Sequence, residues 1–218
     1  HTTKTNYNLS DRATFTAAAE YGGNSALTKK HINTPVMEKG ASVRIVPGNE
    51  STNGLRFTST LVNNATPTRY GTLIVKAADL GDTEFTIAAL TAANIKFANI
   101  EASEEGTVAG DDKTTYNAAL VNLPDAEFNT EFAARAYAVY TINGEEYIVY
   151  SDFTATKNED GSLKGDNIRS LANVAEAALN DTKSTQSTEY CYKIADDTYS
   201  PYTKEQYELL RNYTAKKN

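Results

Sequence analysis

The segment from Phe132 to Tyr150 constrains the fold of this 218-residue chain most, because its pattern is that of a β-hairpin. Residues 132–142 are rich in small, aromatic and β-branched side chains, and residues 145–150 return with a similar pattern. Asn143-Gly144 lies between the two runs. A type I′ turn needs positive φ at both central residues, which Asn and Gly adopt readily. The segment therefore predicts antiparallel sheet.

Further strand-like runs precede the hairpin. Together with it they give about eight short strands at the spacing of a β-sandwich. No strand alternates with a long helix, which disfavours a parallel α/β sheet. The runs are residues 41–46, 54–61, 69–76, 84–90, 95–102 and 114–123. The alternation in the second run places four side chains on one face: Leu55, Phe57, Ser59 and Leu61.

Two amphipathic helices are predicted near the C-terminus. The first runs from Ile168 to Leu179, with Asp166-Asn167 as its cap. The second begins with a capping box formed by Thr203 and Gln206. Tyr207, Leu210 and Tyr213 then lie on one face of this helix. Because short helices are not stable alone in water, we expect both to pack on the sheets. The predicted fold is mainly β, an antiparallel β-sandwich with two C-terminal α-helices packed on it.

The beginning of the chain differs from the rest. Residues 1–37 are rich in Thr and Asn and contain Gly22-Gly23, which predicts an irregular lead-in with one short helix near residues 17–20. Residues 38–218 are predicted to form a single domain.

Composition disfavours two kinds of partner. The chain has 21 basic and 28 acidic residues, a net charge of −7, and its only basic clusters are Lys29-Lys30 and Lys216-Lys217. A nucleic-acid-binding protein needs a basic face, so we expect no nucleic acid. No apolar run approaches the roughly 20 residues of a membrane helix, so we expect no membrane insertion.

The chain is poor in catalytic groups, so we predict that it is not an enzyme and needs no cofactor. Cys191 is the single cysteine, and the only bases that could activate it as a nucleophile are His1 and His31. Glu104-Glu105 and Glu145-Glu146 are consecutive, so within a strand each pair points to opposite faces. An acid pair assembled in space remains an open alternative.

Residues 158–162, with Asp166 shortly after, are rich in oxygen ligands of the kind that calcium prefers. The segment lacks the alternating acids and terminal Glu of an EF-hand. We interpret it as a solvated loop, as we do residues 110–112, and we predict no metal site.

Arg44, Arg56 and Arg135 each interrupt an apolar strand. One hypothesis is a guanidinium cluster that grips the carboxylate of a uronic acid or cell-wall glycan. The structural alternative, which we favour, packs each stem on an aromatic ring and pairs its head with an acid. The rings and acids considered are Tyr137, Phe57, Glu101 and Glu127.

Four tyrosines crowd the segment between the two predicted helices, with Asp196-Asp197 among them. They are Tyr190, Tyr192, Tyr199 and Tyr202. Flat aromatic rings flanked by Asp or Asn suit the C–H face and hydroxyls of a sugar. The alternative is that these rings pin a long loop to the domain. Together with Arg135, the four tyrosines are the predicted ligand-binding residues.

Several short pieces occur in an order that resembles an uncharacterised module of large secreted, multi-modular surface proteins of anaerobic Gram-positive bacteria, including plant-fibre degraders. The resemblance spans roughly residues 40 to 214. It implies an extracellular or cell-wall location and a binding or spacer role, and it provides no catalytic residues. The pieces are residues 40–44, 54–57, 70–74, 134–137, 150–152, Arg169-Ser170, Val174-Ala175 and residues 202–206.

The predicted function is a non-catalytic extracellular module that binds plant or cell-wall polysaccharide through its tyrosine-rich surface. The alternative is a structural spacer or protein–protein adaptor that contacts neighbouring modules and has no small ligand. A third hypothesis is a carboxylate-dependent glycan hydrolase.

Overall fold

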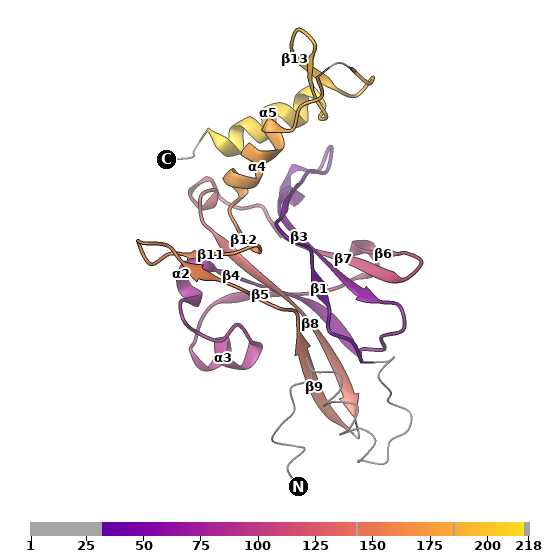
Figure 1. The fold of residues 1–218 in the computed structure, drawn as a ribbon, viewed down its shortest axis with the longest axis vertical. Coiled ribbons are helices and arrows are strands. Elements are labelled where there is room, and N and C mark those ends of the chain that lie inside the picture. The colour runs from indigo at the N-terminus through magenta and orange to yellow at the C-terminus, as the bar shows by residue number, and fades with distance from the viewer. Residues whose placement is uncertain (1–31, 143, 185, 216–218) are drawn as a thin grey trace.

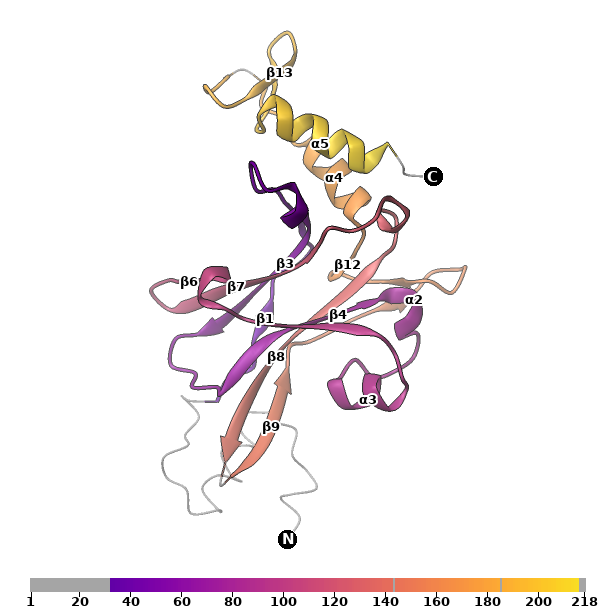
Figure 2. The same ribbon diagram turned by 180° about the vertical axis from the view of Figure 1, so that it is seen from behind.

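Two antiparallel five-stranded sheets form the framework of the protein (Figures 1 and 2). The computed structural model describes residues 32–142, 144–184 and 186–215. Sheet A has the order β1-β3-β7-β6, with β2 also on β3, and sheet B has the order β12-β8-β4-β5, with β9 also on β8. Two short hairpins, β10-β11 and β13-β14, lie outside them. The mainly β, antiparallel prediction is confirmed.

The bounds of the elements are as follows. Sheet A comprises β1 (Val36–Met37), β2 (Ser42–Arg44), β3 (Gly54–Val62), β6 (Thr107–Ala109) and β7 (Lys113–Val121). Sheet B comprises β4 (Arg69–Lys76), β5 (Phe97–Glu101), β8 (Phe132–Ile142), β9 (Glu145–Tyr150) and β12 (Ile168–Arg169). The hairpin strands are β10 (Thr156–Lys157), β11 (Leu163–Lys164), β13 (Tyr192–Ala195) and β14 (Thr198–Ser200). The α-helices are α2 (Ala77–Leu80), α3 (Ile87–Ala92), α4 (Leu171–Asn180) and α5 (Lys204–Thr214), and the 3-10 turns are η2 (Glu50–Thr52), η3 (Glu104–Gly106) and η4 (Asp125–Glu127).

One hydrophobic core joins the two sheets to the C-terminal helices. Phe57 of β3, Ile74 of β4 and Leu171 of α4 belong to the same buried cluster. The face predicted for β3 is confirmed, because its four members are 0–5% exposed: Leu55, Phe57, Ser59 and Leu61. The alternation of β3 therefore marks a strand with one buried face and one solvated face.

The other face of sheet B is also buried. Leu73 of β4 and Val139 of β8 pack in a second cluster with Leu80 of α2, Leu90 of α3 and Leu163 of β11. This double burial explains why β8 reads as a nearly continuous apolar run rather than as an alternating strand.

The predicted hairpin is confirmed as β8 and β9, at the predicted bounds. Gly144 has a φ of 82°, as the turn requires. Asn143 lies outside the described residues.

The first C-terminal helix begins later than predicted. Ile168 and Arg169 pair with β8 as β12, so Asp166-Asn167 is not the cap. Ser170 caps α4 instead, where its Oγ accepts from the N–H of Asn173 at 3.2 Å. The sequence around Ile168 favours both a helix and a strand, and pairing with β8 decides between them.

The second helix is confirmed with its capping box. Thr203 Oγ1 accepts from the N–H of Gln206 at 3.3 Å, and Gln206 Oε1 accepts from the N–H of Thr203 at 3.0 Å. On its predicted face, Leu210 and Tyr213 are buried and Tyr207 is partly buried. In Figures 1 and 2, α4 lies at one end of the sheets and α5 lies on α4.

Two predictions about local structure need comment. The strand predicted for residues 84–90 is wrong: the segment enters α3, capped by Thr86, whose Oγ1 accepts from the N–H of Ala89 at 3.2 Å. In the predicted lead-in, β1 pairs with Thr60 and Ser59 of β3. The short helix predicted near residues 17–20 lies outside the described residues.

Candidate functional site

The four tyrosines predicted to bind ligand lie in different local environments. Tyr192 lies in β13, where its ring contacts Tyr207 of α5 with centroids 5.2 Å apart, and its N–H donates to the carbonyl of Tyr202 at 2.9 Å. Tyr199 lies in β14 and its backbone pairs with Lys183. Tyr190 is 72% exposed. Tyr192 thus helps to hold the β13-β14 hairpin against α5.

Tyr202 follows β14 by two residues and lines a groove of about 640 Å³ that we call the β2–α4 groove. Burial raises the pKa of its phenol, and the charge of Asp181 raises it further. The polar side chains that line the groove are those of Ser42, Arg56, Glu131, Arg169, Asn173, Asp181 and Tyr202. The groove therefore offers an aromatic ring together with hydrogen-bond donors and acceptors.

Arg44 and Arg56 line a second hollow, of about 380 Å³, on the outer face of sheet A. Arg56 lines both this hollow and the β2–α4 groove. Its Nε donates to Ser42 Oγ at 2.8 Å, and Nη1 of Arg44 donates to the carbonyl of Thr52. Within the described part of the chain, neither arginine pairs with a carboxylate.

Arg135 lies elsewhere, on the covered face of sheet B. Its Nε donates to the carbonyl of Ser151 at 2.8 Å, its Nη1 donates to the carbonyl of Phe85 at 2.9 Å, and its guanidinium lies 5.0 Å from the centroid of the Tyr150 ring. Burial lowers the pKa of Arg135. The structure therefore brings two of the three interrupting arginines together, because β8 belongs to the other sheet.

The acids proposed as partners of these arginines are paired with other cations. Glu101 lies 3.8 Å from Nε of Arg69, and Glu127 lies 2.6 Å from Nζ of Lys76. The structural interpretation of Arg135 thus rests on backbone carbonyls and Tyr150.

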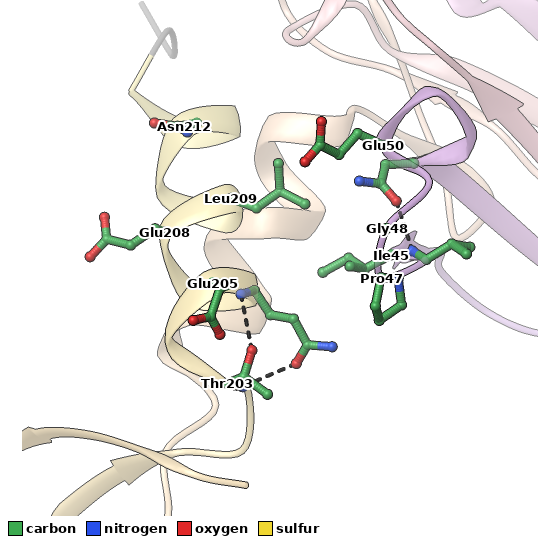
Figure 3. A pocket seen from close by; sticks show the side chains of 12 residues that line it. Ile45, Pro47, Gly48, Glu50, Thr203, Glu205, Glu208, Leu209 and Asn212 are labelled. Carbon is green, nitrogen blue, oxygen red and sulfur yellow. Dashed lines mark hydrogen bonds between the residues drawn. The ribbon is translucent and has the colours of Figure 1, made fainter.

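A third groove, of about 550 Å³, lies between α5 and the connection from β2 to β3 (Figure 3). Leu209 points toward Ile45 and Pro47 across it, while Glu208 points away from that connection. It contains none of the predicted site residues and has a largely apolar floor.

The reactive groups of the described residues are dispersed. Cys191 Sγ lies 2.9 Å from Thr188 Oγ1 and 3.9 Å from Lys183 Nζ, and the hydrogen bond with Thr188 is the main cause that lowers the pKa of the thiol. Both histidines fall outside the described residues. Glu146 pairs with Arg69 at 2.6 Å, and Glu145 accepts from the hydroxyl of Tyr147 at 2.7 Å.

The oxygen-rich loop at residues 158–162 holds itself together. Asp160 Oδ1 accepts from the N–H of Ser162 at 2.9 Å and from its hydroxyl at 2.6 Å, which lowers the pKa of Asp160. Asp166 pairs with Lys39 at 2.9 Å. In the described ranges, no group of three or more His, Cys, Asp or Glu side chains is placed to hold a metal ion.

Sequence reasoning missed most of the β2–α4 groove. Arg169 belongs to the short piece Arg169-Ser170, which indicates no ligand, while Asn173 and Asp181 lie in and just after α4 with no spacing that marks them. The groove is formed when α4 packs beside β2, and this contact joins segments more than 100 residues apart.

No protein-family model, curated protein or solved structure matches this chain. None of the helices in residues 32–142, 144–184 and 186–215 is both long and apolar enough to cross a membrane.

Proposed function

We propose that this chain is a non-catalytic, extracellular or cell-wall-associated module that binds plant or cell-wall polysaccharide in the β2–α4 groove. The observation that carries the proposal is that Tyr202 lines the same groove as Arg56, Asn173 and Asp181. The proposed frame is a β-sandwich in which sheets A and B pack face to face through their shared core.

The chemistry of the groove supports a sugar ligand. A pyranose ring has C–H faces that pack on an aromatic ring, and Tyr202 is half-buried, which limits the entropy lost when a ligand binds. The ring hydroxyls need donors and acceptors in fixed positions. Asn173 offers both, Arg56 offers donors, and Asp181 offers an acceptor.

The test is retention on insoluble cellulose, xylan and pectin, followed by affinity gel electrophoresis with the soluble polymer that is bound. We expect Asn173→Ala and Tyr202→Ala each to weaken retention about tenfold, which corresponds to the loss of one or two good contacts. Tyr190→Ala is the matched control, because this ring lies outside the groove and is 72% exposed. Thermal melts establish that each variant is folded.

Two results would contradict the proposal. Wild-type protein that is retained on no polysaccharide excludes the function itself. Retention that Tyr190→Ala abolishes and Asn173→Ala leaves unchanged moves the site to the β13-β14 hairpin.

A second candidate is the spacer or adaptor role, and the outer face of sheet A favours it. Register places four side chains in one row across this sheet: Val36, Thr60, Thr115 and Val108. The valines at its two ends are 61% and 65% exposed. An open apolar and threonine-rich face suits contact with a neighbouring protein module. This candidate predicts that no polysaccharide retains the chain.

A further inference from the structure

The hollow on the outer face of sheet A owes its shape to small residues beside two arginines. Register places Arg56 opposite Ala119 of β7 and places Arg44 opposite Gly54 of β3. Neither Ala nor Gly can fill the space next to a long side chain. The result is a polar hollow of about 380 Å³, and the lining residues whose side chains the structure describes include no Asp or Glu.

Each guanidinium keeps donors for another molecule. Arg56 uses Nε on Ser42, so both of its terminal nitrogens have no hydrogen-bond partner among the described residues. Nη1 of Arg44 donates to the carbonyl of Thr52. Nε and Nη2 of Arg44 have no hydrogen-bond partner among the described residues. Each arginine therefore retains two adjacent nitrogens, the arrangement that binds a carboxylate with two parallel hydrogen bonds.

Two cations of sheet B differ from this pair, because each has a carboxylate partner. There, Arg69 lies 2.6 Å from Glu146, and Lys76 lies 2.6 Å from Glu127. The chain has an excess of acids, with 28 against 21 basic residues, so acidic partners are plentiful. Arg44 and Arg56 have no carboxylate partner among the described residues, so they can neutralise an acid from outside the chain.

We infer that this hollow binds the carboxylate of a uronic-acid residue, so that the polysaccharide of the proposed function is an acidic one. The inference rests on that function, since it adds a subsite to the same surface. Arg56 lines both cavities, so a chain seated beside Tyr202 continues directly to Arg44. Ser103 and Asn117 supply polar groups for the sugar hydroxyls, and Val121, which is 44% exposed, supplies an apolar contact for the ring.

The experiment compares polygalacturonate with the same polymer after its carboxyl groups are reduced to alcohols. Binding is measured by affinity gel electrophoresis and titration calorimetry on the full chain. We expect wild-type protein to bind polygalacturonate about tenfold or more tighter than the reduced polymer, because charge-assisted bidentate bonds are lost on reduction. Arg44→Gln and Arg56→Gln should each remove most of this preference.

Two further variants make the result specific. Arg56→Lys keeps the charge and loses the planar fork, so it should lose most of the preference as well. Arg211→Gln removes an exposed positive charge from α5, away from the hollow, and should leave both affinities unchanged. Melting temperatures near that of wild type show that the variants are folded.

The outcomes separate the two claims. Equal binding of both polymers, unchanged in Arg44→Gln and Arg56→Gln, overturns the acidic subsite and leaves polysaccharide binding intact. Binding of neither polymer, nor of the cellulose, xylan and pectin tested above, overturns the proposed function and the subsite with it. A preference for polygalacturonate that only Arg211→Gln removes would place the acid-binding surface on α5.

Discussion

The outer faces of the two sheets are built on opposite principles. On sheet B the outward side chains include Leu73, Val75 and Val139, and helices α2 and α3 cover them. On sheet A the outward side chains include Thr58, Thr60 and Asn117, which are polar and only partly buried. The same kind of antiparallel sheet is thus closed on one side of the molecule and available on the other.

This difference shows where a binding surface can arise. The covered face uses its apolar area for stability, at about 25 cal/mol per Å² of area removed from water. The open face contributes little of that kind, so its residues can be selected for contact with other molecules. Arg44 and Arg56 lie on the open face, whereas Arg135 is built into the covered one.

The largest expected effect comes from placing a charge on each face. Val75→Lys would bury an unpaired ammonium among α2, α3 and β8, and we expect it to cost about 4 kcal/mol or more of unfolding free energy. Val108→Lys on the open face should change stability by less than about 0.5 kcal/mol. Urea denaturation measures both. Similar losses of stability in the two variants would contradict the claim that one face is covered and the other is open.

Replacing one glycine by alanine in either sheet should lower stability by a similar amount. The two sheets differ in their outer faces, whereas their strand backbones are packed alike. A Cβ at Gly54 would lie 1.9 Å from the carbonyl oxygen of Leu120, and one at Gly71 would lie 2.4 Å from that of Ile100. We expect Gly54→Ala and Gly71→Ala each to cost about 3 kcal/mol in urea denaturation, since the partner strand must shift.

Gly106 serves as the control for this pair. A Cβ there would lie 3.6 Å from the nearest atom, which is an ordinary contact. Gly106→Ala should therefore leave the urea midpoint nearly unchanged. Wild-type stability in Gly54→Ala would show that β3 and β7 can separate at low cost.

Substitution of an arginine on each face should show a difference in stability of intermediate size. Arg135→Ala removes two hydrogen bonds to carbonyls of the covered face and the contact with Tyr150, so we expect a loss of about 2 kcal/mol. Arg56→Ala on the open face should cost less than about 0.5 kcal/mol. Thermal melts of the two variants measure these losses of stability. A stable Arg135→Ala variant that no longer binds polysaccharide would return Arg135 to the ligand site.

The smallest effect is a dependence on pH. The hydrogen bond from Lys76 is the main cause that lowers the pKa of Glu127, and a hydrogen bond with Thr130 contributes. A carboxylate whose pKa is lowered by folding stabilises the fold above its unfolded pKa, and this stability is lost as the pH falls through the folded pKa. Since the Lys76 side chain is 44% exposed, solvent weakens the pair, and the effect should stay below about 1 kcal/mol.

Glu127→Gln should therefore lose less stability than wild type between pH 6 and pH 3, as measured by melting temperature. Arg56→Gln should follow the wild-type curve, because Arg56 has no carboxylate partner among the described residues. Parallel curves for all three proteins would mean that the Lys76–Glu127 pair contributes nothing.

Much of the fold could be predicted from local pattern. The hairpin of β8 and β9, the alternating face of β3 and the capping box at Thr203 all rest on rules that act within a few residues. The error at residues 84–90 has a local reason too. Helix α3 spans only Ile87–Ala92, which is too short to show a helical period.

The site was harder to predict because it depends on which strands become neighbours. Arg56 and Ser42 are brought together by the pairing of β2 with β3, and Asn117 joins them through the pairing of β3 with β7. Arg135 looked equivalent in sequence, yet β8 joined the other sheet. The four tyrosines were close in sequence, and the turn at Asp197, with a φ of 58°, folded two of them into a hairpin.

The way α5 is attached has a mechanical consequence. It contacts the remainder of the described chain mainly through α4, with Tyr213 packed edge-on against Phe128. Tension applied at the C-terminal end of α5 would peel this helix away one turn at a time, whereas a pull along β3 and β7 would load their hydrogen bonds together. The helix pair would lengthen first and act as a compliant joint, so both sheets would keep their shape under modest force.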